Sequence, residues 1–237
     1  MKRHAFLPST LRALLIIAAS AAVPTAALAH GVTKGDAGYI QTVSGILLFP
    51  FAYLGAKHMV TGYDHLLFLL GVIFFLYRLR DIGVYVTLFA IGHSTTLLLG
   101  VLTGFSVNAY LIDAIIGLSV VYKALDNLGA YERWFGHQPS TRAATLIFGL
   151  FHGFGLATKI LDFRFAQDGL VPNLIAFNVG VEIGQLLALS AILIAMSYWR
   201  RTTSFSRYAY SANVVLMTLG FLLTGYQLAG FFLSPTS

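Results

Sequence analysis

The sequence contains no cysteine and few charged residues. Without thiols the chain cannot form disulfides, and any metal site must use imidazole, carboxylate, amide or backbone oxygen ligands. Only 10% of the 237 residues are charged, whereas a soluble domain carries about 25%. Too little polar surface exists to cover such a fold in water, so a soluble cytosolic enzyme is excluded. A nucleotide-binding motif of the form G-x-x-x-x-G-K-[ST] is also missing, and we expect no nucleotide cofactor.

Hydrophobic residues dominate what is present. They make up 57% of the sequence, and the mean hydropathy is +0.78. The net charge is +6, but Lys2, Arg3 and Arg12 lie at the N-terminus and most other basic residues flank apolar stretches. This distribution is typical of membrane topology rather than of phosphate binding. The sequence therefore predicts an all-α, polytopic helix bundle in a lipid bilayer, which is not an enzyme and has no nucleic-acid partner.

The N-terminus has the pattern of a secretory signal peptide. A basic region is followed by the apolar stretch 14–23 and by small residues at Ala27 and Ala29, so we expect cleavage after Ala29. The alternative is an uncleaved anchor helix. Cleavage gives a single transmembrane domain over 30–237 that begins with His30, whose α-amine and imidazole together could chelate Cu(II) or Ni(II).

Six stretches are long and apolar enough to cross a bilayer, which requires about 20 residues. The predicted spans are 63–79, 82–103, 107–127, 142–161, 172–199 and 208–233. The preceding segment, 43–60, is short and contains Pro50, Lys57 and His58. We expect this segment to lie at the interface or to be re-entrant rather than to cross.

The basic residues set the orientation of these spans, because cytoplasmic loops are enriched in lysine and arginine. The arrangement puts four basic residues outside: Lys34, Lys57, Lys159 and Arg164. It puts eight inside: Arg78, Arg80, Lys123, Arg133, Arg142, Arg200, Arg201 and Arg207. We therefore expect a protein of the bacterial inner membrane with both mature termini in the periplasm.

His58, Asp64 and His65 form the densest group of candidate metal ligands. They fall within eight residues at the start of the first predicted span, and Gly62 allows a tight turn between them. We expect them to converge at the outer mouth of the bundle. Two imidazoles and a carboxylate suit Ni(II), Co(II), Zn(II) or Cu(II) rather than Mg(II). The alternative is that Asp64 caps the helix and the histidines are interfacial.

Further polar residues lie inside the predicted spans, where they are costly and usually face a functional cavity. His93 and His152 fall near the middle of their spans, and Asp113 lies on the third. On the fifth span, Asn178, Glu182 and Gln185 have the spacing i, i+4, i+7, which predicts one helix face. The sequence thus predicts a polar path lined by His93, Asp113, His152, Asn178, Glu182 and Gln185.

The His58-x5-Asp64-His65 pattern resembles the H-x5-D-H signature of the HupE/UreJ family of membrane proteins. Stretches similar to a second branch of that family occur at 61–70, 92–97, 112–122, 148–155 and 177–185. The resemblance implies a metal permease associated with nickel supply to hydrogenase and urease. Its expected partners are the lipid bilayer, the metal ion, and either a metalloenzyme or a periplasmic metal carrier.

One motif departs from the founding branch of the family, which carries F-H-G-x-A-H-G-x-E. Here Phe151, His152 and Gly153 are followed by Phe-Gly-Leu-Ala-Thr-Lys, so the second histidine and the glutamate are missing. Glu182 and Asn178 on the next helix are candidate replacements. The resemblance therefore implies a transition-metal permease, with nickel as the first expectation and cobalt or copper as alternatives.

Two other functions compete with transport. The chain could be a membrane assembly partner of a metalloenzyme, in which case alanine at Asp64 and Glu182 would leave metal uptake intact. It could also be an electron-transfer protein with His93 and His152 as axial ligands of a b-type haem, which a visible spectrum would reveal.

Overall fold

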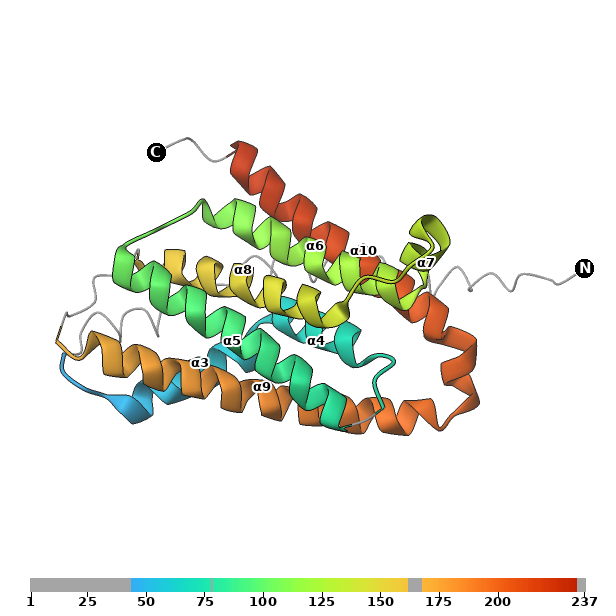
Figure 1. The fold of residues 1–237 in the computed structure, drawn as a ribbon, viewed down its shortest axis with the longest axis horizontal. Helices are drawn as coiled ribbons and strands as arrows, with labels where there is room; N and C mark the ends of the chain where they lie inside the picture. The colour runs from blue at the N-terminus through green and yellow to red at the C-terminus, as the bar shows by residue number, and fades with distance from the viewer. Residues whose placement is uncertain (1–43, 78, 162–167, 234–237) are drawn as a thin grey trace, which may run out of the picture.

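A computed structural model describes residues 44–77, 79–161 and 168–233. This part of the chain is entirely helical, with eight helices and no strand (Figure 1). The helices are α3 (Leu48–Thr61), α4 (Tyr63–Ile73), α5 (Leu79–Thr103), α6 (Ala109–Asn127), α7 (Ala130–Phe135), α8 (Thr141–Leu161), α9 (Leu170–Arg200) and α10 (Thr203–Leu233). The predicted signal peptide and His30 lie outside the described residues.

Four of the described helices are long and apolar enough to cross a membrane. They are Arg80–Thr103, Thr141–Leu161, Leu170–Arg200 and Thr203–Leu233. Each overlaps a predicted span closely. Large apolar side chains such as Leu187, Ile194 and Phe221 are exposed along them, as expected where lipid rather than water surrounds a helix.

The bundle is built from three closely packed helix pairs: α5 with α8, α3 with α9, and α6 with α10. Glycine permits these contacts. A Cβ atom on Gly180 would lie 1.8 Å from the carbonyl oxygen of Ala52, and one on Gly153 would lie 2.2 Å from that of His93. Small residues let membrane helices approach until their backbones touch, and these two positions admit no side chain.

Helix α3 packs along α9, and α4, which follows directly after Gly62, contacts both α6 and α9. Together α3 and α4 form one broken helix. At its start, the Leu47 N–H donates to Asn173 Oδ1 over 2.7 Å. At its end, the Arg200 guanidinium donates to the carbonyl oxygens of Ile73 and Phe74. The two pieces have 14 and 11 residues, so at 1.5 Å per residue neither would cross about 30 Å of hydrocarbon alone. End to end, they match the length of a span.

The helical part of 43–60, a segment expected at the interface or re-entrant, is the first half of this broken helix and packs along α9. The predicted span 63–79 is likewise only the second half, and its helix ends at Ile73.

The break occurs at Gly62, whose backbone is extended (φ −73°, ψ 105°). The Gly62 N–H donates to the His58 carbonyl over 3.0 Å, and its own carbonyl accepts from the Leu66 N–H over 3.1 Å. The interruption therefore leaves the backbone of Gly62 hydrogen-bonded, which is a condition for irregular backbone inside a membrane bundle.

The two ends of the bundle differ. One end, here called the α7 end, carries α7, the turn between α9 and α10, and the end of α4 (Figure 1). The start of α3 and the C-terminal end of α10 lie at the opposite end (Figure 1). The α7 end contains Arg133, Arg142, Arg200 and Arg201.

Candidate metal centre

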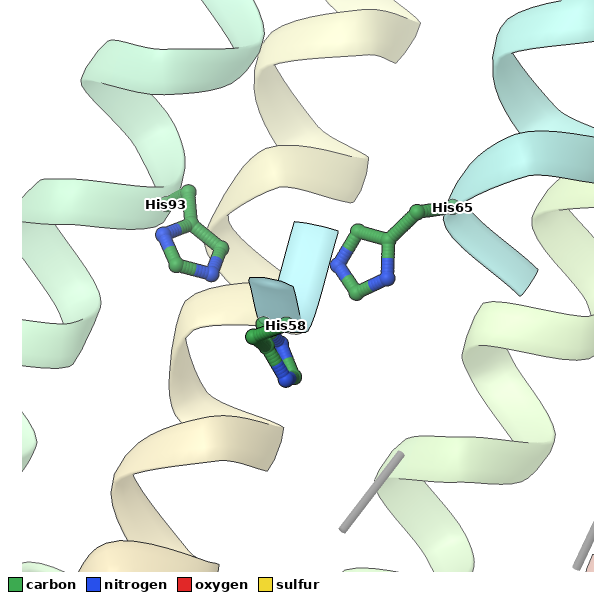
Figure 2. Close-up of side chains that lie close together, drawn as sticks. All are labelled: His58, His65 and His93. Atoms are coloured by element: carbon green, nitrogen blue, oxygen red, sulfur yellow. The ribbon is translucent and has the colours of Figure 1, made fainter. Parts of the chain in front are cut away.

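Three histidines from three helices meet at the break. His58 lies in the last turn of α3, His65 lies in the first turn of α4, and His93 lies near the middle of α5. Each offers one ring nitrogen, and these three atoms all lie within 4.8 Å of one another. Figure 2 shows the rings converging from separate helices. Three imidazoles at this spacing could bind a single divalent ion.

Gly62 brings His58 and His65 together. A Cβ atom at this position would lie 2.5 Å from His65 Nδ1 and 3.1 Å from Asp64 Oδ1. The extended backbone changes the direction of the chain, so that residues on consecutive helices face the same point. The two rings end with their centroids 5.2 Å apart in an edge-on arrangement.

Asp64 orients the His65 ring. Its Oδ1 atom lies 3.2 Å from His65 Nδ1, the contact that a ligand histidine commonly makes with a carboxylate. A ring held by its Nδ1–H presents Nε2 as the ligand atom and gains basicity from the negative charge. Asp64 therefore acts on this site through His65.

His152 is the fourth histidine of the cluster. Its ring centroid lies 4.8 Å from that of His65, and its Nδ1 lies 2.7 Å from the Phe148 carbonyl oxygen. A carbonyl only accepts, so Nδ1 carries the proton and Nε2 carries the lone pair. We define the histidine cluster as His58, His65, His93 and His152.

The cluster is fully enclosed. All four rings are buried, and Phe89 packs against His65, His93 and His152 with centroid distances of 6.1, 6.0 and 5.0 Å. An axially ligated haem would need a slot between His93 and His152, yet both rings contact the same phenylalanine. This packing does not fit the haem alternative.

Two polar groups at the site have unmet hydrogen-bonding capacity. Both ring nitrogens of His93 are buried without a hydrogen-bond partner. Asn178 approaches His93, but neither of its amide atoms makes a hydrogen bond of normal geometry. Buried polar groups are rarely left unsatisfied because each costs free energy. A bound cation would satisfy a His93 nitrogen, and the Asn178 oxygen could add a further ligand.

The cluster lies deeper than the sequence predicted. His93 and His152 are near the midpoints of α5 and α8, and Met59, next to His58, packs at the level of Gly184 in α9. The expectation that His58, Asp64 and His65 form an outer mouth is therefore wrong. They meet the mid-depth histidines because α3 supplies the first half of the broken helix.

Asn178, Glu182 and Gln185, which were predicted to share one face of α9, do not all face the histidine cluster. Gln185 is buried, Asn178 is half-buried and Glu182 is exposed. The three positions span about 60° of arc at 100° per residue, and the edge of the buried face passes between them. Gln185 lines a small cavity with Phe68 and Phe89, toward the α7 end. Glu182 is thus not a lining residue of the described bundle, which corrects the prediction.

Asp113 is placed inside the bundle but is paired with a cation. Its Oδ2 atom accepts a hydrogen bond from Lys159 Nζ over 2.7 Å. The sequence pattern indicated for Lys159 only a place among the four outer basic residues. Lys159 lies seven residues after His152 and so shares its helix face. This spacing is the sequence signal that places Lys159 inside the bundle.

A sequence profile described as HupE / UreJ protein matches residues 34–235, and the chain belongs to this family. The family is associated with nickel and cobalt uptake and consists of membrane accessory and transport proteins. Together with the apolar helices, membership identifies an integral membrane protein. No curated protein and no solved structure matches the chain.

Proposed function

We propose that this member of the HupE/UreJ family moves a divalent transition-metal ion, nickel or cobalt, across the membrane through the histidine cluster. Copper is a further candidate for the same ligands. One observation carries the proposal: three ring nitrogens within 4.8 Å of one another at the break of a helix. Neutral imidazoles are ligands of intermediate softness that bind these ions and not Mg(II).

The broken helix supports transport rather than static binding. Membrane transporters commonly place cargo sites near mid-depth, where a discontinuous helix supplies ligands from both of its pieces. His58 comes from α3 and His65 from α4. A small rotation of one piece against the other would separate these ligands and release the ion.

The frame we propose has six spans. The α3–α4 pair counts as one, and α5, α6, α8, α9 and α10 complete the set. The α7 end faces the cytoplasm, because it holds Arg133, Arg142, Arg200 and Arg201 and cytoplasmic loops are rich in basic residues. The mature chain follows a cleaved signal peptide, and both of its termini are periplasmic in the inner membrane.

A cavity at the cytoplasmic end gives the released ion a place to enter water. Its volume is about 260 Å³. Its polar lining consists of Lys123, Asp126, Asn127, Gln138 and Thr141. Phe68 and Val72 lie between this cavity and the histidine cluster on α4, one and two turns beyond His65. In this conformation the site is closed toward the cytoplasm by apolar side chains.

The test is metal binding and uptake by the purified protein. Equilibrium dialysis with Ni²⁺ should show binding by the wild type and much weaker binding by His65→Asn, which keeps polarity and approximate size. His137→Asn is the matched control because His137 is exposed and distant from the cluster in the chain. Equal binding by both variants would overturn the proposal.

Uptake separates transport from an assembly role. Proteoliposomes that contain this chain alone should accumulate Ni²⁺ or Co²⁺, and the His65→Asn variant should not. A wild type that binds metal without accumulating it would favour a metalloenzyme assembly partner.

A further inference from the structure

A buried ion pair lies on the side of the histidine cluster that is away from the α7 end. Asp113 on α6 and Lys159 on α8 are 2.7 Å apart, and their side chains are only 7% and 17% exposed. Lys159 follows His152 by seven residues, which is about 10 Å along a helix on the same face. A Cβ atom on Gly155 would lie 3.7 Å from Asp113 Oδ1, so the carboxylate sits between the levels of His152 and Lys159.

Only one of the two oxygens of the Asp113 carboxylate accepts a hydrogen bond. Oδ2 accepts from Lys159, while Oδ1 is buried without a hydrogen-bond partner. Asp126, a second buried acid paired with a lysine, is different. Its Oδ1 accepts from Gln138 over 2.6 Å, and its Oδ2 accepts from Lys123 over 2.5 Å and from Thr141 over 3.2 Å. Both carboxylate oxygens of Asp126 therefore accept hydrogen bonds from protein groups, whereas Asp113 keeps one oxygen for another cation.

We propose that Lys159 is a tethered counter-cation that a divalent ion displaces from Asp113 on its way to the histidine cluster. This inference rests on the proposed function. In the absence of the ion, the ammonium neutralises the buried carboxylate, which would otherwise be costly at this depth. When the ion arrives, Oδ1 and then Oδ2 bind it, and the ammonium swings aside.

The exchange discriminates by charge. A carboxylate attracts a divalent ion about twice as strongly as a monovalent one at the same distance. A divalent ion can therefore replace the ammonium, while a sodium or potassium ion gains no electrostatic advantage over it. Lys159 is in this way a specificity-determining residue for the proposed cargo.

The same arrangement makes opposite predictions for the two partners. Lys159→Met leaves a negative charge near the cluster and should tighten Ni²⁺ binding by about tenfold. Asp113→Asn leaves the ammonium uncompensated and should weaken binding by about tenfold. Adding Lys159→Met to Asp113→Asn removes both charges and should return the affinity to near the wild-type value. A merely structural ion pair would not tighten binding when broken.

Calorimetric titration of the full chain in detergent with Ni²⁺ tests the proposal. Arg142→Met is the control, because it removes a positive charge from an exposed side chain outside the cluster and should leave the affinity unchanged. Weakened or unchanged binding in a well-folded Lys159→Met protein would overturn the proposal. If that variant folds poorly, Asp113→Asn and the double variant decide, and no recovery in the double variant would overturn it. Absence of binding by the wild type would instead refute the proposed function.

Discussion

The ring of His65 lies 4.8 Å from the ring of His152, although the two come from α4 and α8. The first belongs to a short motif around a helix break, and the second lies near the midpoint of a helix long enough to span. Their approach joins the motif to the interior of the bundle. It also defines what the break does: it brings together at mid-depth ligands such as His58 and His65, which a regular helix would hold about 10 Å apart along its axis.

Gly62→Ala should weaken Ni²⁺ binding about 10- to 100-fold, the range seen when the support of a metal ligand is lost. The added methyl group would lie 2.5 Å from His65 Nδ1 and must displace the ring. Equilibrium dialysis measures the effect. Gly83→Ala is the control, because its Cβ meets nothing within 4 Å. Equal affinities for the two variants would show that the break does not need glycine.

Gly180→Ala should destabilise the bundle, because its Cβ would lie 1.8 Å from the Ala52 carbonyl oxygen. Overpacking typically costs about 1–3 kcal/mol, and contact with rigid backbone costs more. The thermal transition of the protein in detergent should fall. The matched variant Gly225→Ala has open space around its Cβ and should be neutral or slightly stabilising. A Gly180→Ala protein with the wild-type transition would contradict the close α3–α9 packing.

Glu182→Gln should leave Ni²⁺ uptake within about twofold of the wild type, since Glu182 is exposed on the outside of α9. Asp64→Asn should reduce binding about 10- to 100-fold, because the charge that supports His65 is lost. Uptake by proteoliposomes compares the two at matched protein levels. Collapse of uptake in Glu182→Gln would return that residue to the pathway and argue against the arrangement described here.

The absence of cysteine makes the topology directly testable. Single cysteines at Ile46 and Trp134, which are both exposed, would lie at opposite ends of the bundle. A membrane-impermeant maleimide added to intact spheroplasts should label Ile46→Cys and not Trp134→Cys. Lysed cells should show labelling of both. The reverse pattern in intact spheroplasts would invert the proposed orientation.

The sequence predicted the later helices well, because α5, α6, α8, α9 and α10 are continuous apolar stretches with clear ends. It did not predict the broken helix. Pro50 and Lys57 make the segment before Gly62 look too polar to cross, and nothing local shows that two short helices follow one another along α9. The contact of Gly180 with the Ala52 backbone decides this, and it is a tertiary feature.

The candidate site was predicted only in part, because its geometry also depends on tertiary contacts. Residue type identified His58, His65, His93 and His152, since ligand-type residues in apolar segments are conspicuous. Helical periodicity alone could not locate the edge of the buried face on α9, and so Glu182 was placed inside. Lys159 was overlooked because charge counting treats a lysine near a span end as solvated, whereas its contact with Asp113 is buried.

X-ray absorption at the nickel K-edge tests the central claim most directly. The Ni²⁺-loaded wild type should show imidazole scattering from the three histidines whose ring nitrogens lie within 4.8 Å of one another. His93→Asn should lose part of that scattering, because His93 is the ligand that α5 brings to the break. An oxygen-dominated shell without imidazole scattering, or a His93→Asn spectrum identical to the wild type, would contradict a metal centre at the histidine cluster.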